Sequence, residues 1–303
     1  MKTVITAGAK GADIDVLACV VAYAELLELE GHESVPVVAG EFTMSVTPKI
    51  LGWGAEYTST YTPDGTERFV LVDISDPDQF PSFVDVTRVD EVYDHRAGHE
   101  KYWEEKLGVN SHVEMVGACG TLVWEEFKKR GKSQDISSPS AKLLLASIVS
   151  NTLNFKAPLT TDRDKVAYSE LSKLTGLNDD WIAEYFSDQE AILMQDFKKY
   201  LGVDTKVFKV GSDDFVIGQL ELWDADKLLS EKSNLIDDVM KDYDHIPWIV
   251  NILNISKGHN YIYSKSESGK KTIAKTLNVT FDDNIAKTKE LLLRKYIMKE
   301  LRS

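Results

Sequence analysis

The sequence predicts an α/β protein whose first half forms a parallel, Rossmann-like sheet. Short apolar runs of the kind that form buried parallel strands recur at residues 4–6, 69–72 and 89–93. A long helical stripe from residue 14 to residue 29 follows the first of these runs. This alternation of strands and helices predicts βαβ units, with helices covering both faces of the sheet.

Further elements continue the alternation up to about residue 160. A strand is expected near residues 35–38, and helices are expected over residues 121–129 and 140–153. From residue 162 to residue 200 the apolar residues keep helical spacing almost throughout. The first half of the chain is therefore expected to end in a helical segment.

The pattern changes after Gly202, which indicates a second, smaller domain of mixed α/β type. Strands are expected first, then a helix, two further strands, and a Lys- and Ser-rich stretch that reads as a solvated strand pair or loop. We expect a first domain over residues 1–188, a linker or hinge over 189–200 and a second domain over 201–303. The elements expected in the second domain are strands 205–210 and 215–222, helix 225–243, strands 248–253 and 261–263, and the solvated stretch 265–275.

Composition narrows the classes of function. The chain has 303 residues, of which 43% are hydrophobic and 28% charged, as in ordinary globular proteins. No apolar run approaches the roughly 20 residues needed to cross a bilayer, so no membrane partner is expected. The net charge of −14 disfavours binding to a nucleic-acid backbone, which needs a basic surface. A small phosphate-containing substrate remains compatible, because a bound cation and a few lysines can reverse the field inside one cleft.

The cysteines and the N-terminus favour a cytoplasmic protein. Cys19 and Cys119 both fall in predicted helices, and two thiols in a chain of this size indicate buried, reduced residues rather than a disulfide framework. Residues 1–5 run directly into a strand without the small-residue cleavage site of a secretory signal.

Acidic and imidazole groups follow three of the predicted strands. Asp13 and Asp15 come after the first, Asp73 ends another, and Asp94-His95 ends a third. Groups at the carboxyl ends of parallel strands converge on one crevice, where carboxylates repel one another unless a cation lies among them. Oxygen ligands with a minority of imidazole suit Mn²⁺ or Mg²⁺ better than Zn²⁺. The alternative reading is that the aspartates only cap helices.

These pieces, in this order, resemble the DHH phosphoesterase superfamily. The similarity is greatest to the branch with manganese-dependent (family II) inorganic pyrophosphatases, exopolyphosphatases and prune proteins. It rests on the segments Gly11–Asp15, Val72-Asp73 and Tyr93–Arg96, and above all on Leu143–Thr161, which resembles that branch's LLxAIxSDTLxFKxPTTT stretch. The resemblance implies a DHH domain, a second domain of the DHHA2 type, and an active site in the cleft between them.

The resemblance also implies which residues bind substrate and metal. Lys198, Arg294 and Lys295 look like the basic residues that meet the substrate phosphates. One metal would have Asp13 and Asp73 as ligands, and another would have Asp15, Asp73, His95 and Asn151. Asp73, His95 and Arg96 would be the catalytic residues, with one or two Mn²⁺ or Mg²⁺ ions as cofactor. A homodimer through the edge of the first sheet is also implied.

The departures from the family pattern all lie at residues that the resemblance assigns to the site. Ala9 replaces a histidine ligand, Arg96 replaces the second histidine of the signature, Asn151 replaces an aspartate and Leu293 replaces a serine. An amide oxygen brings no charge and Arg96 adds a positive one, so both changes weaken cation binding. The same Arg96 can clamp a phosphate in bidentate fashion, which predicts a weakened, degenerate metal site with phosphate binding largely kept.

Two functions are therefore open. The first is metal-dependent hydrolysis of phosphoanhydride bonds in inorganic polyphosphate or pyrophosphate. The second is a catalytically degenerate protein of the same fold that binds a phosphate ligand. A nucleotide phosphodiesterase of the same superfamily is disfavoured, because the Gly-Gly-His motif of those proteins is absent; the nearest string is residues 257–260.

Three further residues have open roles. His99 is either a substitute ligand or substrate contact, or a solvated loop residue. His112 lies in a predicted loop and strand segment, Ser111–Val116, where the resembling family has a substrate-side stretch, so a substrate contact is open for it. Lys156 either faces the phosphates or snorkels to the surface.

Overall fold

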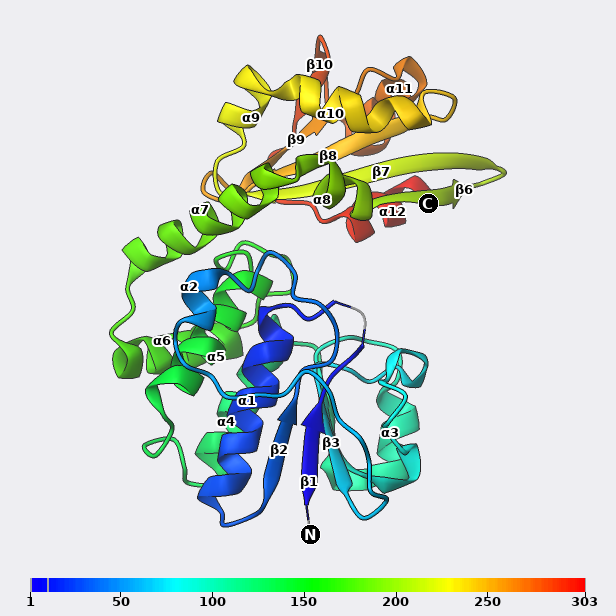
Figure 1. Cartoon of the computed structure of the whole chain (residues 1–303). Coiled ribbons are helices and arrows are strands. Elements are labelled where there is room, and N and C mark those ends of the chain that lie inside the picture. Colours follow the sequence, from blue (N-terminus) through cyan, green and yellow to red (C-terminus); the bar gives the residue numbers. More distant parts are fainter. Residues whose placement is uncertain (1, 10, 303) are drawn as a thin grey trace. The chain divides into compact units, whose positions relative to one another are not determined.

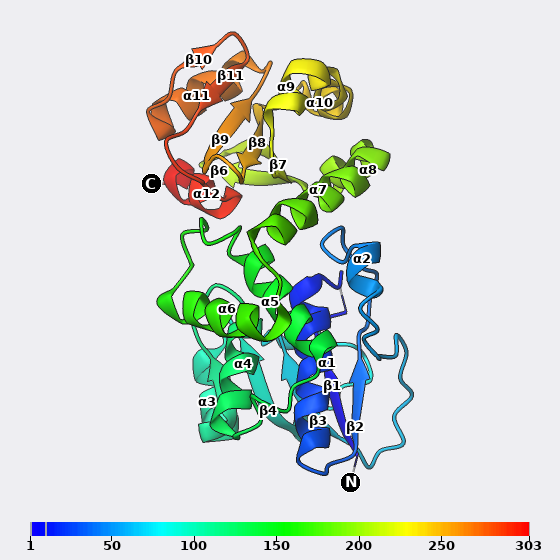
Figure 2. The same ribbon diagram turned by 90° about the vertical axis from the view of Figure 1, so that its left-hand side faces the viewer.

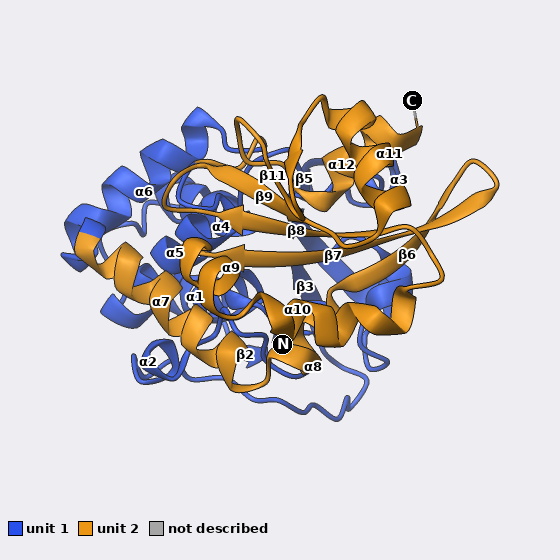
Figure 3. Cartoon of the chain, turned by 90° about the horizontal axis from the view of Figure 1, so that it is seen from above, with its two compact units in different colours: residues 1–155, 159–179 blue, residues 156–158, 180–303 orange. Residues whose placement is uncertain are grey.

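The computed structural model describes residues 2–9 and 11–302, and the chain divides into two compact units (Figure 3). The first unit contains residues 1–155 and 159–179, and the second contains residues 156–158 and 180–303. Helices occupy the segment expected to be a linker, because α7 (Asp179–Gln195) and α8 (Phe197–Val203) cover most of it. A hinge over residues 189–200 stays a prediction.

The first unit contains a parallel sheet of five strands in the order β2-β1-β3-β4-β5. This confirms the predicted parallel α/β architecture. The strands that the apolar runs predict are present with small shifts at their ends, and the short β5 lies within residues 111–116, which were expected to form a loop and strand segment. The strands are β1 (Thr3–Thr6), β2 (Ser34–Val37), β3 (Arg68–Val72), β4 (Val89–Asp94) and β5 (Ser111–Val113).

Helices cover both faces of this sheet (Figures 1 and 2). On one face, Trp103 of α3 packs into a core with Val4, Phe69 and Leu71 of the strands. On the other, the ring of Tyr23 in α1 lies against Tyr93 of β4, with ring centroids 5.0 Å apart. The helices of the unit are α1 (Ile14–Leu29), α2 (Pro48–Leu51), α3 (Glu100–Leu107), α4 (Cys119–Lys129), α5 (Ser138–Asn151) and α6 (Asp162–Thr175); short 3₁₀ turns are η1 (Pro77–Gln79), η2 (Val86–Arg88) and η3 (Gly108–Asn110).

The strand order determines where a site can form. Strands β1 and β3 are neighbours although β2 lies between them in sequence, so the chain leaves them in opposite directions along the sheet. In open parallel sheets a crevice forms at such a switch point, outside the carboxyl ends of the strands. The segments that follow β1, β3 and β4 carry the acidic and imidazole residues singled out above.

The second unit contains a mixed sheet of six strands in the order β10-β11-β9-β8-β7-β6. Only β7 and β8 pair in parallel; the other pairs are antiparallel. One face packs on α11 and α12 through a core that includes Phe215, Ile249, Ile273 and Ile297. The unit's elements after α7 and α8 are β6 (Thr205–Val210), β7 (Asp213–Leu222), α9 (Asp226–Glu231), α10 (Ser233–Met240), η4 (Lys241–Tyr243), β8 (Trp248–Asn254), β9 (His259–Tyr263), α11 (Glu267–Leu277), β10 (Phe281–Asp282), β11 (Ile285–Lys287) and α12 (Arg294–Arg302).

Two sequence expectations for this unit are corrected. Residues 265–275 form most of helix α11 rather than a solvated strand pair or loop, because Ser266 caps the helix through the N–H of Gly269 and Ile273 anchors it in the core. The single helix expected over 225–243 is divided at Lys232, whose backbone leaves the helical region with φ −139°. Within the described ranges, no helix is long and apolar enough to span a bilayer.

Candidate metal centre

Three side chains from different segments converge at the carboxyl edge of the parallel sheet. Asp15, Asp73 and His95 each offer a ligand atom, and these atoms all lie within 4.8 Å of one another. His95 Nε2 is 3.4 Å from Asp73 Oδ1 and 3.8 Å from Asp15 Oδ2. The structure thus brings together three of the ligands that the sequence indicates.

Asp15 is held by the N-terminus of α4. Its Oδ2 accepts the N–H of Cys119 at 2.8 Å and its Oδ1 accepts the N–H of Gly120 at 2.9 Å. The side chain is fully buried, so burial, followed by the charge of Asp73, raises the pKa of Asp15. The two backbone amides and the helix dipole offset part of that cost and fix the carboxylate in position.

Asp73 is positioned by an unusual backbone conformation at the end of β3. Its φ is +53°, in the left-handed region that a short polar residue tolerates better than most. Oδ2 accepts a hydrogen bond from Arg96 Nη2 at 2.9 Å, and the Asp73 carbonyl accepts one from Nη1 at 2.7 Å. Oδ1 is buried and, among the described residues, accepts no hydrogen bond. Such an oxygen is costly unless a cation or a solvent molecule lies against it.

His95 is aimed at the two carboxylates by its backbone neighbours. Its Nδ1 lies 3.3 Å from the carbonyl oxygen of Val116, which favours a proton on Nδ1 and leaves Nε2 free to ligate in the neutral ring. Burial opposes protonation of His95, but Asp73 and then Asp15 outweigh it and raise its pKa to about 9. Likewise, burial alone would raise the pKa of Asp73, but Arg96 and His95 lower it below its ordinary value.

Asp94, the first residue of the Asp-His pair, acts as a positioning residue. It is buried and accepts hydrogen bonds from Ser75 Oγ, from the N–H of His95 at 2.8 Å and from the N–H of Arg96 at 3.3 Å. These bonds hold the turn after β4, and that turn directs His95 and Arg96 into the crevice.

Asp13 has the capping role that the sequence left open as the alternative to metal binding. It is the N-cap of α1, and its Oδ1 accepts the N–H groups of Asp15 and Val16, both at 3.0 Å. Burial, followed by the charges of Asp73 and Asp15, raises the pKa of Asp13 to about 7. Asp13 nevertheless lines the same cavity as Asp73, so it can cap the helix and face the crevice at once.

Arg96 puts a permanent cation into this cluster. Beyond its two contacts with Asp73, its Nη1 lies 4.0 Å from Asp94 Oδ1, and the charge of Asp73 raises its pKa further. Its side chain is 49% exposed and lines a cavity of about 330 Å³, together with Gln79 and His99. The guanidinium therefore neutralises one side of Asp73 and presents its other face to the cavity.

Asn151 lies at the last position of α5. Its side-chain amide donates to the Ser147 carbonyl at 3.3 Å, within its own helix. Among the described contacts, none joins Asn151 to Asp15, Asp73 or His95, so its role as a ligand stays a prediction.

The three basic residues expected to meet phosphate all lie in the second unit. Lys198 is exposed in the first turn of α8. Arg294 is paired: its Nη2 is 2.6 Å from Asp204 Oδ1, and its guanidinium also donates to the Asp204 carbonyl. Lys295 is exposed beside it, and partial desolvation lowers its pKa.

Two residues with open roles prove to have structural contacts. Lys156 Nζ donates to the carbonyls of Ile255 and Ser256, the latter at 2.9 Å, so its ammonium group is hydrogen bonded within the second unit. His112 stacks on the ring of Tyr93 with centroids 4.6 Å apart, which supports a packing role. His99 lines the cavity beside Arg96, and its Nε2 lies 3.8 Å from Asp76 Oδ1.

The sequence reasoning missed the residues that hold the cluster in place. Ser75 and the amides of Cys119 and Gly120 contribute no metal ligands but fix Asp94 and Asp15. The available signal was the pair Gly117 and Gly120 around the start of a helix, since close backbone approach there requires glycine. A Cβ on Gly120 would lie 2.1 Å from Ser147 Oγ and 3.4 Å from Asp15 Oδ1.

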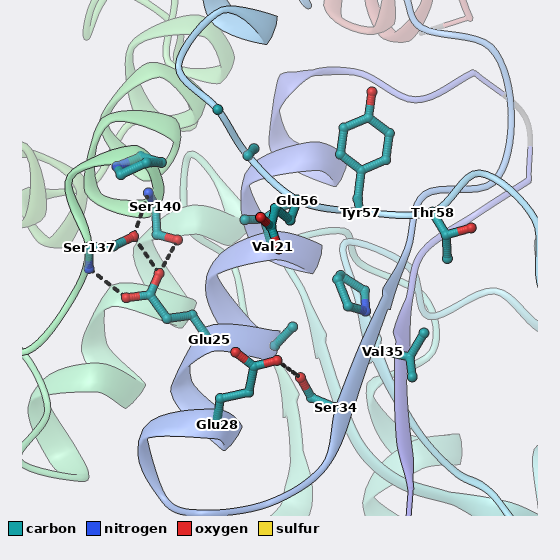
Figure 4. A pocket seen from close by; sticks show the side chains of 15 residues that line it. Val21, Glu25, Glu28, Ser34, Val35, Glu56, Tyr57, Thr58, Ser137 and Ser140 are labelled. Carbon is teal, nitrogen blue, oxygen red and sulfur yellow. Dashed lines mark hydrogen bonds between the residues drawn. The ribbon is translucent and has the colours of Figure 1, made fainter.

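A second hollow of the first unit, of about 530 Å³, lies beside α1 and β2 and has different chemistry (Figure 4). Several of its polar groups hydrogen bond to one another. Glu25 accepts hydrogen bonds from Ser137 and Ser140, and Glu28 accepts one from Ser34. No basic side chain is among its lining residues, so it lacks a group that could bind phosphate.

The cluster suits a hard divalent cation. It offers carboxylate oxygens with one imidazole nitrogen, which is a donor set that Mn²⁺ and Mg²⁺ accept. Asp73 Oδ1, which is buried and accepts no hydrogen bond from the described residues, is the particular atom that a cation would satisfy.

No protein-family model matches the chain. It is nevertheless 26% identical over 300 residues to a Bacillus licheniformis protein named "Probable manganese-dependent inorganic pyrophosphatase", covering 97% of this chain and 96% of that protein. A protein of the same name from Shouchella clausii is 29% identical over 237 residues, covering 77% and 75%.

Two solved structures share the fold. A candidate family II inorganic pyrophosphatase of Methanococcus jannaschii has a TM-score of 0.67 at 21% identity, covering 100% of this chain and 98% of that one. An exopolyphosphatase-related protein of Bacteroides fragilis has a TM-score of 0.54 at 14% identity, covering 99% and 90%. A parallel five-stranded sheet followed by a mixed six-stranded sheet is the fold that the chain shares with these two structures. Over nearly its whole length the chain is therefore similar to proteins named as manganese-dependent inorganic pyrophosphatases, and it has the fold of a family II pyrophosphatase and of an exopolyphosphatase-related protein.

Proposed function

We propose that this protein hydrolyses phosphoanhydride bonds in inorganic pyrophosphate or polyphosphate with the help of a divalent cation. The observation that carries the proposal is the buried cluster of Asp15, Asp73 and His95, in which one carboxylate oxygen accepts no hydrogen bond from the described residues. The names of the relatives support the same reaction class.

The proposed cofactor is Mn²⁺ or Mg²⁺, held by Asp15, Asp73 and His95, with Asp13 and Asn151 as further candidate ligands. When bound, such a cation polarises the phosphoryl group and lowers the pKa of a water molecule. The chain's own residues prepare for it: the amides of α4 fix Asp15, and Val116 sets the orientation of the His95 ring.

Arg96 is the proposed phosphate contact within the first unit. Its exposed half faces the cavity, and a guanidinium matches the geometry of phosphate oxygens. Lys198, Arg294 and Lys295 are the proposed phosphate contacts from the second unit, where they offset charge on the transferred group. A cytoplasmic location and a homodimer stay predictions.

We further propose that the site holds one cation firmly rather than two. Arg96 already donates a hydrogen bond to Asp73 Oδ2, which makes that oxygen less available to a second cation. Ala9 supplies no imidazole, and Asn151 supplies no charge. The cluster of Asp15, His95 and Asp73 Oδ1 offers ligands for one ion.

Phosphate release tests the hydrolase. The purified protein is incubated with pyrophosphate, tripolyphosphate and a dinucleotide in Mn²⁺, Mg²⁺ or Co²⁺, alongside Asp73→Ala. Turnover of the first two substrates above that of Asp73→Ala is expected, with little on the dinucleotide. Turnover no higher than that of Asp73→Ala on any substrate would leave the alternative, a catalytically degenerate phosphate-binding protein.

Restoring the family residues tests the weakened site. Arg96→His combined with Asn151→Asp removes one cation and adds one carboxylate, so we expect Mn²⁺ affinity to rise by about tenfold or more. Calorimetric titration measures both affinity and stoichiometry. Unchanged affinity and stoichiometry would show that these two residues do not limit cation binding.

A further inference from the structure

Five basic side chains line one hollow of the second unit, between β6 and α12. They are Lys206 of β6 and Arg294, Lys295, Lys299 and Arg302 of α12, and the hollow measures about 640 Å³. No acidic residue is among its lining residues. In a chain with a net charge of −14, such a collection of one sign stands out from the rest of the surface.

Most of these cations are not neutralised by the protein. The ion pairs described for the second unit include those of Lys209, Lys270 and Arg294, but none of Lys206, Lys295 or Lys299. Arg294 is the exception, since it pairs with Asp204. Lys295 and Lys299 are four residues apart on one helix, a spacing at which like charges repel. An anionic ligand would relieve that repulsion.

The floor of the hollow is rigid and apolar. Phe208 and Met298 line it and also pack against the core of the mixed sheet. Lys206 and Phe208 are two residues apart on β6, so their side chains extend from the same face of the strand. An apolar floor beneath charged groups lowers the local dielectric and strengthens their field toward a ligand.

The basic side chains form an elongated surface along α12, which we call the track, rather than a compact pocket. From Lys295 to Arg302 the helix advances seven residues, which corresponds to about 10 Å. One pyrophosphate cannot span the proposed phosphate contacts Arg294 and Lys295 and also reach Arg302 at the far end. A linear polyanion with a negative charge on every unit can.

We propose that this track, which begins at Lys295 and continues over Lys206, Lys299 and Arg302, binds the distal phosphates of long-chain inorganic polyphosphate through the last three residues. The inference rests on the proposed function, because it takes Arg294 and Lys295 as contacts to the phosphates near the scissile bond. Long-chain polyphosphate is then the preferred substrate, and pyrophosphate uses only the near end of the track. The track supplies affinity through displaced counterions, so its contribution falls as salt rises.

Binding in the presence of EDTA tests the track without hydrolysis. The variants are Lys299→Gln with Arg302→Gln, which removes two charges from the track, and Lys271→Gln with Lys275→Gln, which removes two exposed charges from α11. The ligands are long-chain polyphosphate, tripolyphosphate and a single-stranded DNA oligonucleotide. Melting curves check that each variant is folded.

The track variant is expected to bind long-chain polyphosphate about tenfold more weakly than wild type, with tripolyphosphate affected much less. The slope of its log Kd against log salt is expected to fall by about 1.4, for two lost contacts. The α11 variant is expected to behave as wild type. Equal losses in both double variants, or DNA binding as tight and as sensitive to the track variant as polyphosphate binding, would overturn the proposal.

The same set of proteins separates this inference from the hydrolase proposal. Track-dependent binding of long chains without any metal-dependent phosphate release would leave the track standing and remove the hydrolase. Hydrolysis of pyrophosphate and tripolyphosphate, with no advantage for long chains and no effect of the track variant, would remove the track alone.

Discussion

The acidic cluster of the first unit and the basic residues of the second unit differ in their burial and in how their charged groups are held in place. Asp15 and Asp73 are buried, and hydrogen bonds from amides or a guanidinium fix all but one of their oxygens. Lys206, Lys295 and Lys299 are exposed to solvent. A buried cluster requires a specific partner for nearly every carboxylate oxygen, whereas a basic track requires only that several cations lie on one face.

This difference explains where substitution matters. In the cluster, exchanging one residue alters its neighbours, as Arg96 does by taking Asp73 Oδ2 and raising the charge of the site. In the track, each lysine acts on the ligand through solvent and contributes independently. Metal binding should therefore depend steeply on single residues, while polyanion binding should decline gradually.

The largest expected effect is on the reaction itself. Asp73→Asn should lower kcat/KM for pyrophosphate by more than about 100-fold and weaken Mn²⁺ binding. Asp73 is a proposed metal ligand, and replacing a ligand costs more activity than replacing a residue that only supports one, which typically costs about 10–100-fold. Lys295→Gln should raise KM by about tenfold and leave Mn²⁺ affinity unchanged, because it removes only a proposed phosphate contact. Steady-state kinetics and calorimetric Mn²⁺ titration measure the two effects.

The opposite effects of these two substitutions would contradict the proposed difference between the acidic cluster and the basic track. If Lys295→Gln weakened Mn²⁺ binding as much as Asp73→Asn did, the two regions would not be separate in function. If Asp73→Asn kept both activity and Mn²⁺ affinity, the cluster would not be the metal centre.

A single carboxylate of the second unit is expected to make stability depend on pH. Burial, followed by the charge of Asp204, raises the pKa of Glu221 from 4.5 to about 7, despite a 2.9 Å hydrogen bond from Gln219. Between these values the folded state binds the proton that the unfolded state releases, so stability falls as pH rises from about 4.5 to 7. At pH 8 the wild type is destabilised by up to about 3 kcal/mol from this group.

Glu221→Gln should therefore raise the free energy of unfolding at pH 8 by up to about 3 kcal/mol and leave it nearly unchanged at pH 4. Urea titrations at the two pH values measure the difference. Glu231→Gln, an exposed carboxylate in the same unit, is the control and should show no such pH dependence. Equal behaviour of the two variants would mean that Glu221 is charged at low cost in the folded protein.

Local patterns in the sequence were enough to predict the strands and the residues that end them. Period and composition identified β1, β3 and β4, and parallel pairing then required Asp15, Asp73 and His95 to meet. What the patterns could not contain were contacts between distant segments. The amides of Cys119 and Gly120 lie more than 100 residues from Asp15, and Asp204 lies 90 residues from Arg294.

The error at residues 265–275 has a similar cause. Lysine and serine dominate the stretch, and composition alone favoured a solvated loop. One cap at Ser266 and one buried side chain, Ile273, were sufficient to fix helix α11 on the sheet. Tertiary packing of a few apolar residues outweighs the polar character of the others.

The smallest expected effect concerns the packing beneath the metal cluster. Gly120→Ala places a methyl group against Ser147 Oγ and near Asp15 Oδ1, and overpacking of this kind costs about 1–3 kcal/mol. The N–H of Gly120 also supports Asp15, so a weaker Mn²⁺ affinity should accompany the loss of stability. Thermal unfolding and Mn²⁺ titration measure both quantities.

Two further variants sharpen this result. Gly202→Ala in α8, where a Cβ would meet nothing within 4 Å, should stabilise the second unit by about 0.4–1 kcal/mol. Adding Ser147→Ala to Gly120→Ala removes the closest contact and should recover part of both stability and Mn²⁺ affinity. Recovery of stability without Mn²⁺ affinity would show that the Gly120 amide itself, rather than the space around it, sets the position of Asp15. Recovery of neither would exclude the contact with Ser147 as the cause, and the tight fit beneath the cluster would no longer distinguish the first unit from the second.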